Sequence, residues 1–421
     1  MTRAPMPSDQ DPTRPAAATL PDNHKPRKGS FHRLPEILGA FLKLGCISFG
    51  GPIAHLSYLY EEFVTRRRWL DDAAYADLVA LCQFLPGPAS SQLVFALGMQ
   101  RAGIVGACLA SACFTLPSAL LMILFAYGVT AIGDLSHAGW LHGLKLAAVA
   151  VVAQAVWTMG RKLCPDRPRI TVALVSAAIM LVVPGAIVQV GMITLGAIVG
   201  WTLYRKEVPS VVSSGSLARH HAWAAGVLVS FGALLVVLPM FAAVTGSRPL
   251  AVFDSFYRAG SLVFGGGHVI LPLLRAEVVP PGWVSDNAFL AGYGAAQAVP
   301  GPLFTFAAYL GTLISGGSGA WLGGLWCLVA IFLPAWMLIG GALPFWQLLR
   351  GRSWTQAALQ GANAAVVGVL LAALFHPVWT EGVTGVRDVA ALFLAFMLLE
   401  TWRAPSWLVV AMMAVAGQWL L

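Results

Sequence analysis

Long apolar stretches separated by short polar segments dominate the chain from about residue 35 onward. The stretch from residue 103 to residue 130 carries no ionisable side chain other than cysteine and tyrosine. A helix needs about 20 predominantly apolar residues to cross the hydrocarbon core of a bilayer. The pattern therefore predicts an all-α polytopic membrane protein.

The composition agrees with this prediction. The 421 residues are 58% hydrophobic and only 10% charged, whereas soluble domains contain about 25% charged residues. Soluble enzymes, secreted disulfide scaffolds and nucleic-acid-binding modules are thereby excluded. The formal net charge of the chain is +8. We expect the excess lysine and arginine residues to lie in cytoplasmic loops, because positively charged loops resist translocation. Five of the six cysteines lie in apolar segments without metal-ligand spacing, which indicates packing residues and no metal site.

The first 34 residues differ from the rest. They are rich in proline, alanine and charge and contain no apolar core. Such a segment is neither a signal peptide nor a membrane span, and we expect a disordered tail over residues 1–34. Its basic residues favour a cytoplasmic N-terminus.

An internal repeat organises the remaining chain. A glycine-rich motif with an upstream cation occurs twice in one register: Phe41, Lys43, Gly45 and Phe49-Gly50-Gly51-Pro52, then Phe256, Arg258, Gly260 and Phe264-Gly265-Gly266-Gly267. A Pro-Gly-Pro motif follows each copy, with Gln83 before Pro86-Gly87-Pro88 and Gln297 before Pro300-Gly301-Pro302. Other landmarks recur in the same order: Glu62 and Glu277, Trp69 and Trp283, Asp72 and Asp286, Pro117 and Pro334, Gly143 and Gly361. This order predicts a tandem duplication with halves at residues 35–221 and 222–421.

The distribution of charge predicts that the two halves have opposite orientations. In the first half Arg66-Arg67-Arg68 and the basic loop at residues 161–169 flank a loop at residues 133–140 without lysine or arginine. In the second half the basic loop, with Arg350 and Arg352, replaces the neutral one. The positive-inside rule then predicts an inverted repeat with a cytoplasmic linker at residues 205–219 and an additional crossing at residues 222–244.

Each half contains two interruptions of apolar sequence. In the first half they are Phe49-Gly50-Gly51-Pro52 and Pro86-Gly87-Pro88. Proline removes a backbone donor and glycine permits sharp turns, so we expect broken or re-entrant helices here rather than straight spans. Irregular backbone persists at membrane depth only where it is buried in protein or lines a polar cavity.

The four breaks together predict an anion site. Each break exposes backbone N–H groups and a helix N-terminus that carries about half a positive charge. Lys43 and Arg258 lie six residues before the two Phe-Gly-Gly motifs, and charges within a span are usually functional. Amide donors, helix ends and cations suit an oxyanion. The alternative for the two cations is that they extend to the membrane interface.

Several polar residues near the breaks have two interpretations. Gln83 and Gln297 either donate hydrogen bonds to a ligand or form hydrogen bonds between helices. Ser90, Ser91 and Thr305 cap the following helix or donate to a ligand. His55 and His268 follow the breaks and could titrate, and His268 could contact the substrate or carry a proton. Glu61, Glu62 and Glu277 lie in loops and pair with arginine, or they carry a coupling proton. No GxxxxGK[ST] motif occurs, so we expect no nucleotide site.

These motifs resemble the chromate ion transporter family. The resemblance rests on Phe49-Gly50-Gly51-Pro52, on residues 61–70 and on residues 83–88, and the second copies at residues 264–268 and 297–302 resemble the long-chain, two-domain members. It implies export of chromate from the bacterial cytoplasm, chromate resistance, and sulfate as a structural analogue. The second half departs from the first at Gly267, which replaces Pro52, and at Ile270, which replaces His55.

We therefore expect a secondary transporter in the bacterial inner membrane that exports chromate and has no catalytic residue, metal or cofactor. The alternatives are a sulfate or other oxyanion transporter, a membrane-embedded chromate reductase and a non-transporting scaffold. The expected partners are chromate, sulfate and the lipid bilayer, with a homodimer left open and no nucleic acid. The candidate substrate-binding residues are Lys43, Phe49, Gly50, Gly51, Pro52, Gln83, Pro86, Gly87, Pro88, Arg258, Phe264, Gly265, Gly266, Gly267, His268, Gln297, Pro300, Gly301 and Pro302.

Overall fold

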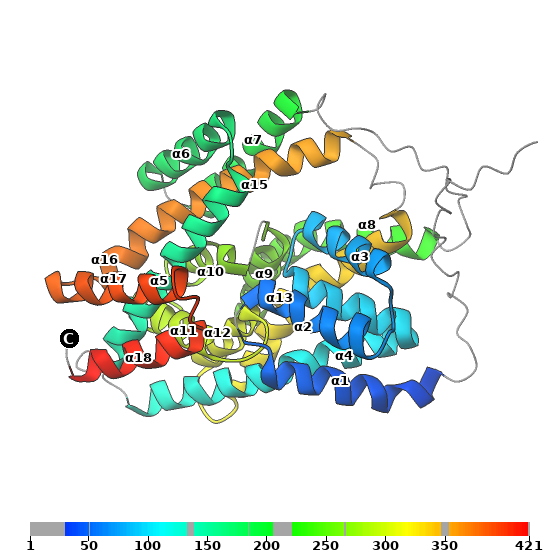
Figure 1. The fold of residues 1–421 in the computed structure, drawn as a ribbon, viewed down its shortest axis with the longest axis horizontal. Helices are drawn as coiled ribbons and strands as arrows, with labels where there is room; N and C mark the ends of the chain where they lie inside the picture. Colours follow the sequence, from blue (N-terminus) through cyan, green and yellow to red (C-terminus); the bar gives the residue numbers. More distant parts are fainter. Residues whose placement is uncertain are drawn as a thin grey trace, which may run out of the picture.

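The computed structural model describes residues 30–49, 51–132, 139–183, 185–204, 221–264, 267–346 and 353–419. All regular structure in these ranges is helical (Figure 1). Six helices are long and apolar enough to cross a membrane. The prediction of an all-α polytopic membrane protein is confirmed. Most of the predicted tail at residues 1–34, the predicted linker and the loops with Arg350 and Arg352 lie outside the described residues.

The helices of the first half begin near the predicted start. They are η1 (Ser30–Arg33), α1 (Leu34–Ile47), α2 (Gly51–Tyr60), η2 (Glu61–Arg66), α3 (Asp72–Phe84), α4 (Ala89–Ile132), α5 (Gly139–Leu163), α6 (Arg167–Val182) and α7 (Ala186–Tyr204). The two interruptions fall where the sequence predicts them, between α1 and α2 and between α3 and α4.

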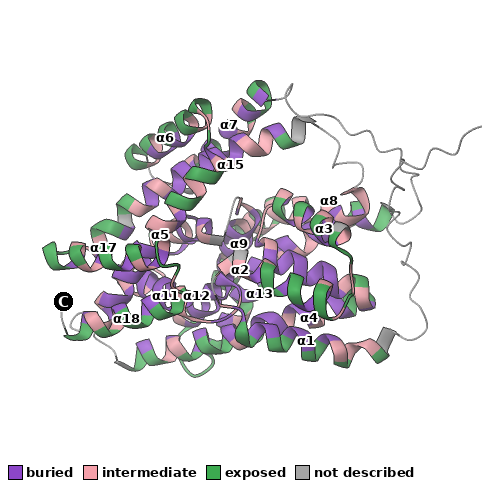
Figure 2. Cartoon of the chain, in the orientation of Figure 1, coloured by how far each residue is buried: buried purple, intermediate pink, exposed green. Residues whose placement is uncertain are grey.

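The second half repeats this order after one additional helix, α8 (His221–Thr245). The others are α9 (Arg248–Ser261), η3 (Gly267–Val269), α10 (Ile270–Val278), α11 (Asp286–Ala298), η4 (Leu303–Thr305), α12 (Phe306–Ser315), α13 (Ala320–Ala342), η5 (Leu343–Phe345), α15 (Ser353–Ala373), η6 (Leu374–Trp379), α16 (Thr380–Gly382), α17 (Val386–Glu400) and α18 (Ser406–Trp419). Buried residues concentrate where α4, α5, α9, α11, α12 and α13 meet (Figure 2).

Helix α4 reverses direction in its first third. Ala102 and Gly103 leave helical geometry, with φ of −144° and 66°. A Cβ added at Gly98 would lie 2.4 Å from the carbonyl oxygen of Gly106, although eight residues of continuous helix would separate them by about 12 Å. The equivalent reversal in the second half separates α12 from α13, where Gly311 lies against Gly323. The segment that follows each Pro-Gly-Pro motif therefore packs antiparallel against the helix that comes after the reversal.

The two halves are interleaved through glycine contacts. Gly139 of α5 lies against Gly417 of α18, and Gly143 lies against Met413, so these helices run antiparallel. Helices α7 and α15 make the equivalent antiparallel contact. Small residues allow the backbones of membrane helices to approach closely. This reciprocal packing is the arrangement that an inverted repeat predicts.

The contact between α7 and α15 depends on Gly361. A Cβ added there would lie 2.0 Å from the carbonyl oxygen of Gly196, so we expect Gly361→Ala to lower the free energy of unfolding by about 1–3 kcal/mol. The control is Gly191→Ala on α7, where an added Cβ meets no atom within 4 Å, and alanine is the better helix former. Thermal unfolding in detergent should show a lower midpoint for Gly361→Ala only. Equal midpoints would contradict the close packing of α7 against α15.

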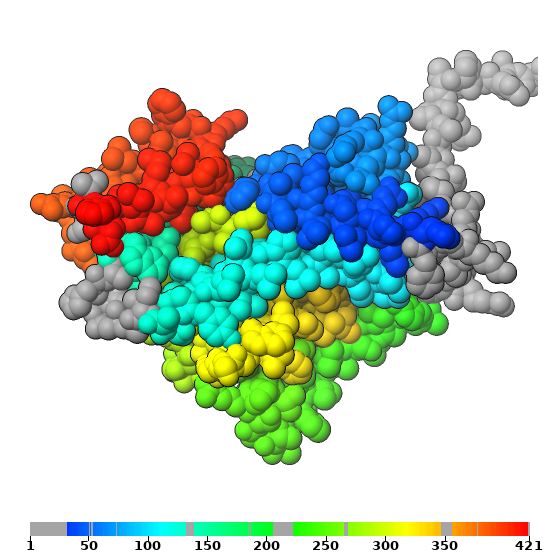
Figure 3. Space-filling view, turned by 90° about the horizontal axis from the view of Figure 1, so that it is seen from below, coloured from blue at the N-terminus to red at the C-terminus, as the bar shows by residue number. Residues whose placement is uncertain are grey.

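Helix α8 stands apart from the interleaved helices. Its crossing segment, Ala222–Thr245, is strongly apolar, yet only 6% of an 18-residue window within it is buried in the protein. In Figure 3 the green segment that includes α8 protrudes from the body. The helix matches the additional crossing that the sequence predicts between the halves, because an odd number of crossings inverts the second half relative to the first.

Candidate functional site

The breaks of the two halves are joined by two main-chain hydrogen bonds. The N–H of Gly87 donates to the carbonyl oxygen of Val263 at 2.7 Å, and the N–H of Gly301 donates to that of Ser48 at 2.8 Å. We call these two interactions the crossed bonds. Each connects the Pro-Gly-Pro break of one half to the residue before the Phe-Gly-Gly motif of the other. Gly50, Gly265 and Gly266 themselves lie outside the described residues.

Glycine is required at the centre of each Pro-Gly-Pro break. Gly87 has φ of 121° and Gly301 has φ of 102°. Residues with a Cβ atom rarely adopt such positive φ values. An added Cβ at Gly87 would lie 3.0 Å from the Cβ of Ala335, and one at Gly301 would lie 2.7 Å from the Oγ of Ser118. Both neighbours directly follow repeat-equivalent prolines in α13 and α4, so the two breaks rest on equivalent helices.

His55 connects the crossed bond at Ser48 with the Pro-Gly-Pro break of the first half. Its Nε2 lies 3.0 Å from the carbonyl oxygen of Ser48, and its Nδ1 lies 3.4 Å from the Oγ of Ser90. These neighbours assign the proton to Nε2, so that Nδ1 accepts from the serine hydroxyl. The ring is 1% exposed and contacts Phe114 edge-on. His55 therefore holds Ser48, Gly301 and the start of α4 in one cluster.

His268 has a different environment. Its Nδ1 lies 2.9 Å from the hydroxyl oxygen of the buried Tyr293 on α11. The short helix η3 that carries it contacts η4, which begins directly after Pro302. The second half thus also brings its two breaks together, through the contact between η3 and η4. His268 bonds to a tyrosine of α11 instead of a serine at the break, and Ile270 occupies the position equivalent to His55.

Four buried polar side chains near the breaks have unused hydrogen-bonding capacity. In the described part of the chain, Ser48 Oγ, Ser91 Oγ, Gln92 Oε1 and Gln297 Nε2 have no partner. Gln92 uses its other terminal atom, since its Nε2 donates to the carbonyl oxygen of Pro86 at 2.8 Å. Buried polar atoms are usually hydrogen-bonded, and exceptions often mark functional sites. Ser48, Ser91 and Gln297 can supply neutral donors to an anion.

Helix ends supply further donors at the same place. Helices α2, α4, η3 and η4 begin directly after the breaks, at Gly51, Ala89, Gly267 and Leu303. The first N–H groups of a helix lack intrahelical acceptors and carry the positive end of its dipole. Oriented N–H groups of this kind bind oxyanions without a formal positive charge.

The two predicted cations are neutralised by repeat-equivalent carboxylates. Lys43 Nζ lies 3.4 Å from Glu62 Oε2, and its side chain is 49% exposed. Arg258 lies 2.9 Å from Glu277 and 2.9 Å from Asp254. Glu62 also pairs with Arg66 and Arg67. The structure therefore places both cations in ion pairs rather than beside the partnerless donors, and agrees with the arginine pairing expected for Glu62 and Glu277. The expected position of Glu61, Glu62 and Glu277 in loops is wrong, because they lie in η2 and α10.

The remaining predicted residues are arranged unequally. Gln83 is exposed, whereas its counterpart Gln297 is partly buried with a partnerless amide nitrogen. Phe49 is half-buried, with its ring 5.9 Å from that of Trp407, and Phe264 is also half-buried. Pro88, Pro300 and Pro302 are buried, and Pro86 is half-buried. The side chain of Pro52 lies outside the described part of the structure.

Sequence reasoning missed Ser48 and Gln92 and gave Ser91 only a capping or donor role. A usable signal was present, because Ser48 directly precedes Phe49 and Gln92 lies four residues after Pro88. Among the residues that the structure describes, no group of three or more His, Cys, Asp or Glu side chains could hold a metal ion. The partnerless groups at the breaks are hydroxyls and amides, and helix ends lie beside them.

Comparisons with known proteins identify relatives over nearly the whole chain. A family model described as "Chromate transporter" matches residues 35–201 and again residues 250–418. A chromate transport protein of Pseudomonas aeruginosa is 31% identical over 396 residues, 92% of each chain. A probable chromate transport protein of Synechococcus elongatus is 28% identical over 402 residues, 92% of this chain and 95% of the relative. A chromate transport protein of Cupriavidus metallidurans is 27% identical over 402 residues, 92% of this chain and 95% of the relative. No solved structure matches.

Proposed function

Because the chain belongs to the chromate transporter family, we propose that it is a secondary transporter that exports chromate from the bacterial cytoplasm and confers chromate resistance. In this proposal it lies in the inner membrane with its N-terminus in the cytoplasm. Its relatives are named as transport proteins, which argues against a chromate reductase.

The observation that carries the proposal is the meeting of the four breaks. The crossed bonds bring backbone turns from both halves together, and Ser48, Ser91 and Gln297 supply buried donors without partners there. A tetrahedral oxyanion could accept hydrogen bonds from these donors and from the helix N-termini. We propose that chromate binds among them and that the predicted residues of the four breaks line this site, while Lys43 and Arg258 remain in their ion pairs.

The energetics favour export. Burying a bare dianion in an apolar medium would cost tens of kcal/mol, so the ion needs an organised polar site. A membrane that is negative inside supplies roughly 2.3 kcal/mol per charge at 100 mV. A dianion therefore gains about 4.6 kcal/mol on leaving the cell at that potential. Neither uniport nor proton-coupled exchange would require ATP.

The direct test measures radiolabelled chromate uptake into inverted membrane vesicles with imposed voltage or pH gradients. Export predicts uptake that an inside-positive vesicle potential increases. Sulfate competition separates the two oxyanions, because a sulfate transporter would be inhibited by sulfate at concentrations well below those of chromate. Uptake that is indifferent to both gradients would contradict a secondary transporter that exports a dianion.

The serine donors give a sharper test. We expect Ser48→Ala and Ser91→Ala each to raise the KM for chromate roughly tenfold, because a hydrogen bond to a charged group contributes about 1.5–3 kcal/mol. Ser176→Ala is the matched control, since the Oγ of Ser176 is also buried and partnerless but lies on α6, where it faces Gly368 of α15. The same KM for all three variants would remove these serines from the site.

A further inference from the structure

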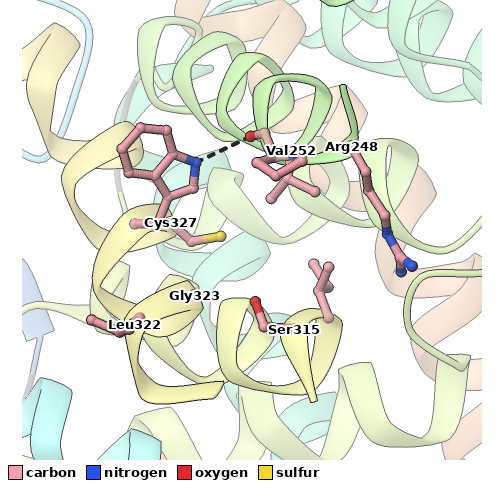
Figure 4. Close-up of a pocket in the computed structure, with 9 residues that line it drawn as sticks. Arg248, Val252, Ser315, Leu322, Gly323 and Cys327 are labelled. Carbon is pink, nitrogen blue, oxygen red and sulfur yellow. Dashed lines mark hydrogen bonds between the residues drawn. The ribbon is translucent and has the colours of Figure 1, made fainter. Parts of the chain in front are cut away.

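A cavity of about 560 Å³ lies between the start of α9, the end of α12 and the start of α13. Its lining is mostly apolar and includes Val252, Ile314, Leu322 and Trp326, with Arg248 at one side (Figure 4). This volume falls within the roughly 300–1,000 Å³ typical of ligand sites. The proposed chromate site does not use any of these residues.

The cavity lies at the end of a membrane crossing. Helix α8, whose crossing segment has few buried residues, ends at Thr245, and Arg248 follows three residues later. Arg248 is exposed and forms no ion pair with the residues that the structure describes. An arginine at the end of a span lies at the depth of the lipid phosphates. The ring of Trp326 is 44% exposed, as expected for an interfacial aromatic residue.

The first half shows which groups are missing from this place. By the repeat register, Arg33 corresponds to Arg248, and Glu36 corresponds to Ala251. Glu36 accepts hydrogen bonds from Arg101 at 2.7 Å and from Trp69 at 3.0 Å. Arg101 is the last residue before the reversal in α4.

In the second half these groups are replaced by smaller ones. Ala251 has no carboxylate, and Ser315 ends α12 where the reversal begins. The ion pair of the first half therefore has no counterpart, and Arg248 remains beside the open volume. A ligand with a negative charge and an apolar chain would fill the space in the second half that corresponds to the Glu36–Arg101 pair.

We propose that this cavity binds an anionic phospholipid, with one acyl chain against Val252, Ile314 and Leu322 and its phosphate paired with Arg248. Trp326 holds one wall in place, because its Nε1 donates to the carbonyl oxygen of Pro249 at 3.0 Å (Figure 4). The apolar lining favours a lipid over a free phosphate, since an inorganic anion would leave that lining exposed to water.

The test titrates the full chain in detergent with phosphatidylglycerol and with phosphatidylcholine of identical acyl chains, followed by native mass spectrometry. We expect phosphatidylglycerol to bind roughly fivefold more tightly to the wild-type protein. Arg248→Gln should abolish this preference. Ala251→Glu should abolish it as well, because it restores the carboxylate of the first half beside Arg248. Arg387→Gln, which removes an exposed arginine at the start of α17, should retain the preference.

Four outcomes would overturn the proposal. Equal affinity for the two lipids, or a preference that survives Arg248→Gln, would exclude recognition of the phosphate by Arg248. Competition by glycerol phosphate at the same concentration as phosphatidylglycerol would indicate a site for free anions. Leu322→Trp narrows the apolar part of the cavity, and unchanged binding of both lipids to this variant would exclude an acyl chain there.

Discussion

Gly301→Ala is expected to lower chromate transport at least tenfold and to destabilise the protein. The variant places a Cβ at a residue with φ of 102° and only 2.7 Å from Ser118 Oγ. Backbone strain and overpacking each cost about 1–3 kcal/mol. Relief of either would move the N–H that donates to Ser48. We expect transport into inverted vesicles to fall at least tenfold per folded molecule, and the same for Gly87→Ala.

Gly282→Ala is the control for this prediction. Gly282 also has positive φ, 72°, but an added Cβ there meets no atom within 4 Å. It therefore reports backbone strain without crowding or a crossed bond. Thermal unfolding and vesicle uptake are measured on all three variants. Normal uptake by Gly301→Ala, with a stability like that of Gly282→Ala, would show that the crossed bonds are dispensable.

Arg258→Gln is expected to destabilise the protein much more than Lys43→Gln. Arg258 is the ion-pair partner of both Asp254 and Glu277, so its loss leaves two largely buried carboxylates without a cation. Breaking a buried pair by removing one partner costs about 3–5 kcal/mol, and we expect the lower end here because Arg258 is 36% exposed. Glu62 retains Arg66 and Arg67 when Lys43 is neutralised, so we expect less than about 1 kcal/mol. Thermal unfolding in detergent measures both.

A compensated variant separates the structural role of Arg258 from a role in binding. Combining Arg258→Gln with Asp254→Asn and Glu277→Gln removes the unpaired charges. If this variant regains stability and transports chromate, Arg258 acts on the fold alone. If it regains stability but does not transport, while Asp254→Asn with Glu277→Gln and an intact Arg258 does transport, the charge of Arg258 serves the anion directly, as the sequence predicts. Failure to regain stability would contradict the ion pairs described for Arg258.

The sequence predicts the outline of the fold well because its strongest signals are local or repeated. The apolar stretches predict the helices, and the paired motifs predict two halves with breaks at Pro86-Gly87-Pro88 and Pro300-Gly301-Pro302. The structure confirms these features. Proline and glycine determine such breaks locally, so their position does not depend on the packing of distant helices.

Contacts between distant residues were not predictable in the same way. No local pattern specifies that Gly87 bonds to Val263 rather than to a residue of its own half. Likewise, Lys43 and Glu62 are 19 positions apart, and only the hairpin formed by α1 and α2 brings them together. In the sequence, Lys43 and Arg258 therefore had no identifiable ion-pair partner and were predicted to contact the anion. That the Oγ of Ser48 has no partner depends on three-dimensional packing, which one sequence does not contain.

The crossed bonds constrain how such a protein could move. A hairpin of one half cannot withdraw from the centre without giving up a bond to the backbone of the other half. Opening toward either side of the membrane thus disturbs both halves at the same time. The two halves would therefore move together. A conformational cycle in which one half moves while the other stays rigid is disfavoured, because it would break a crossed bond.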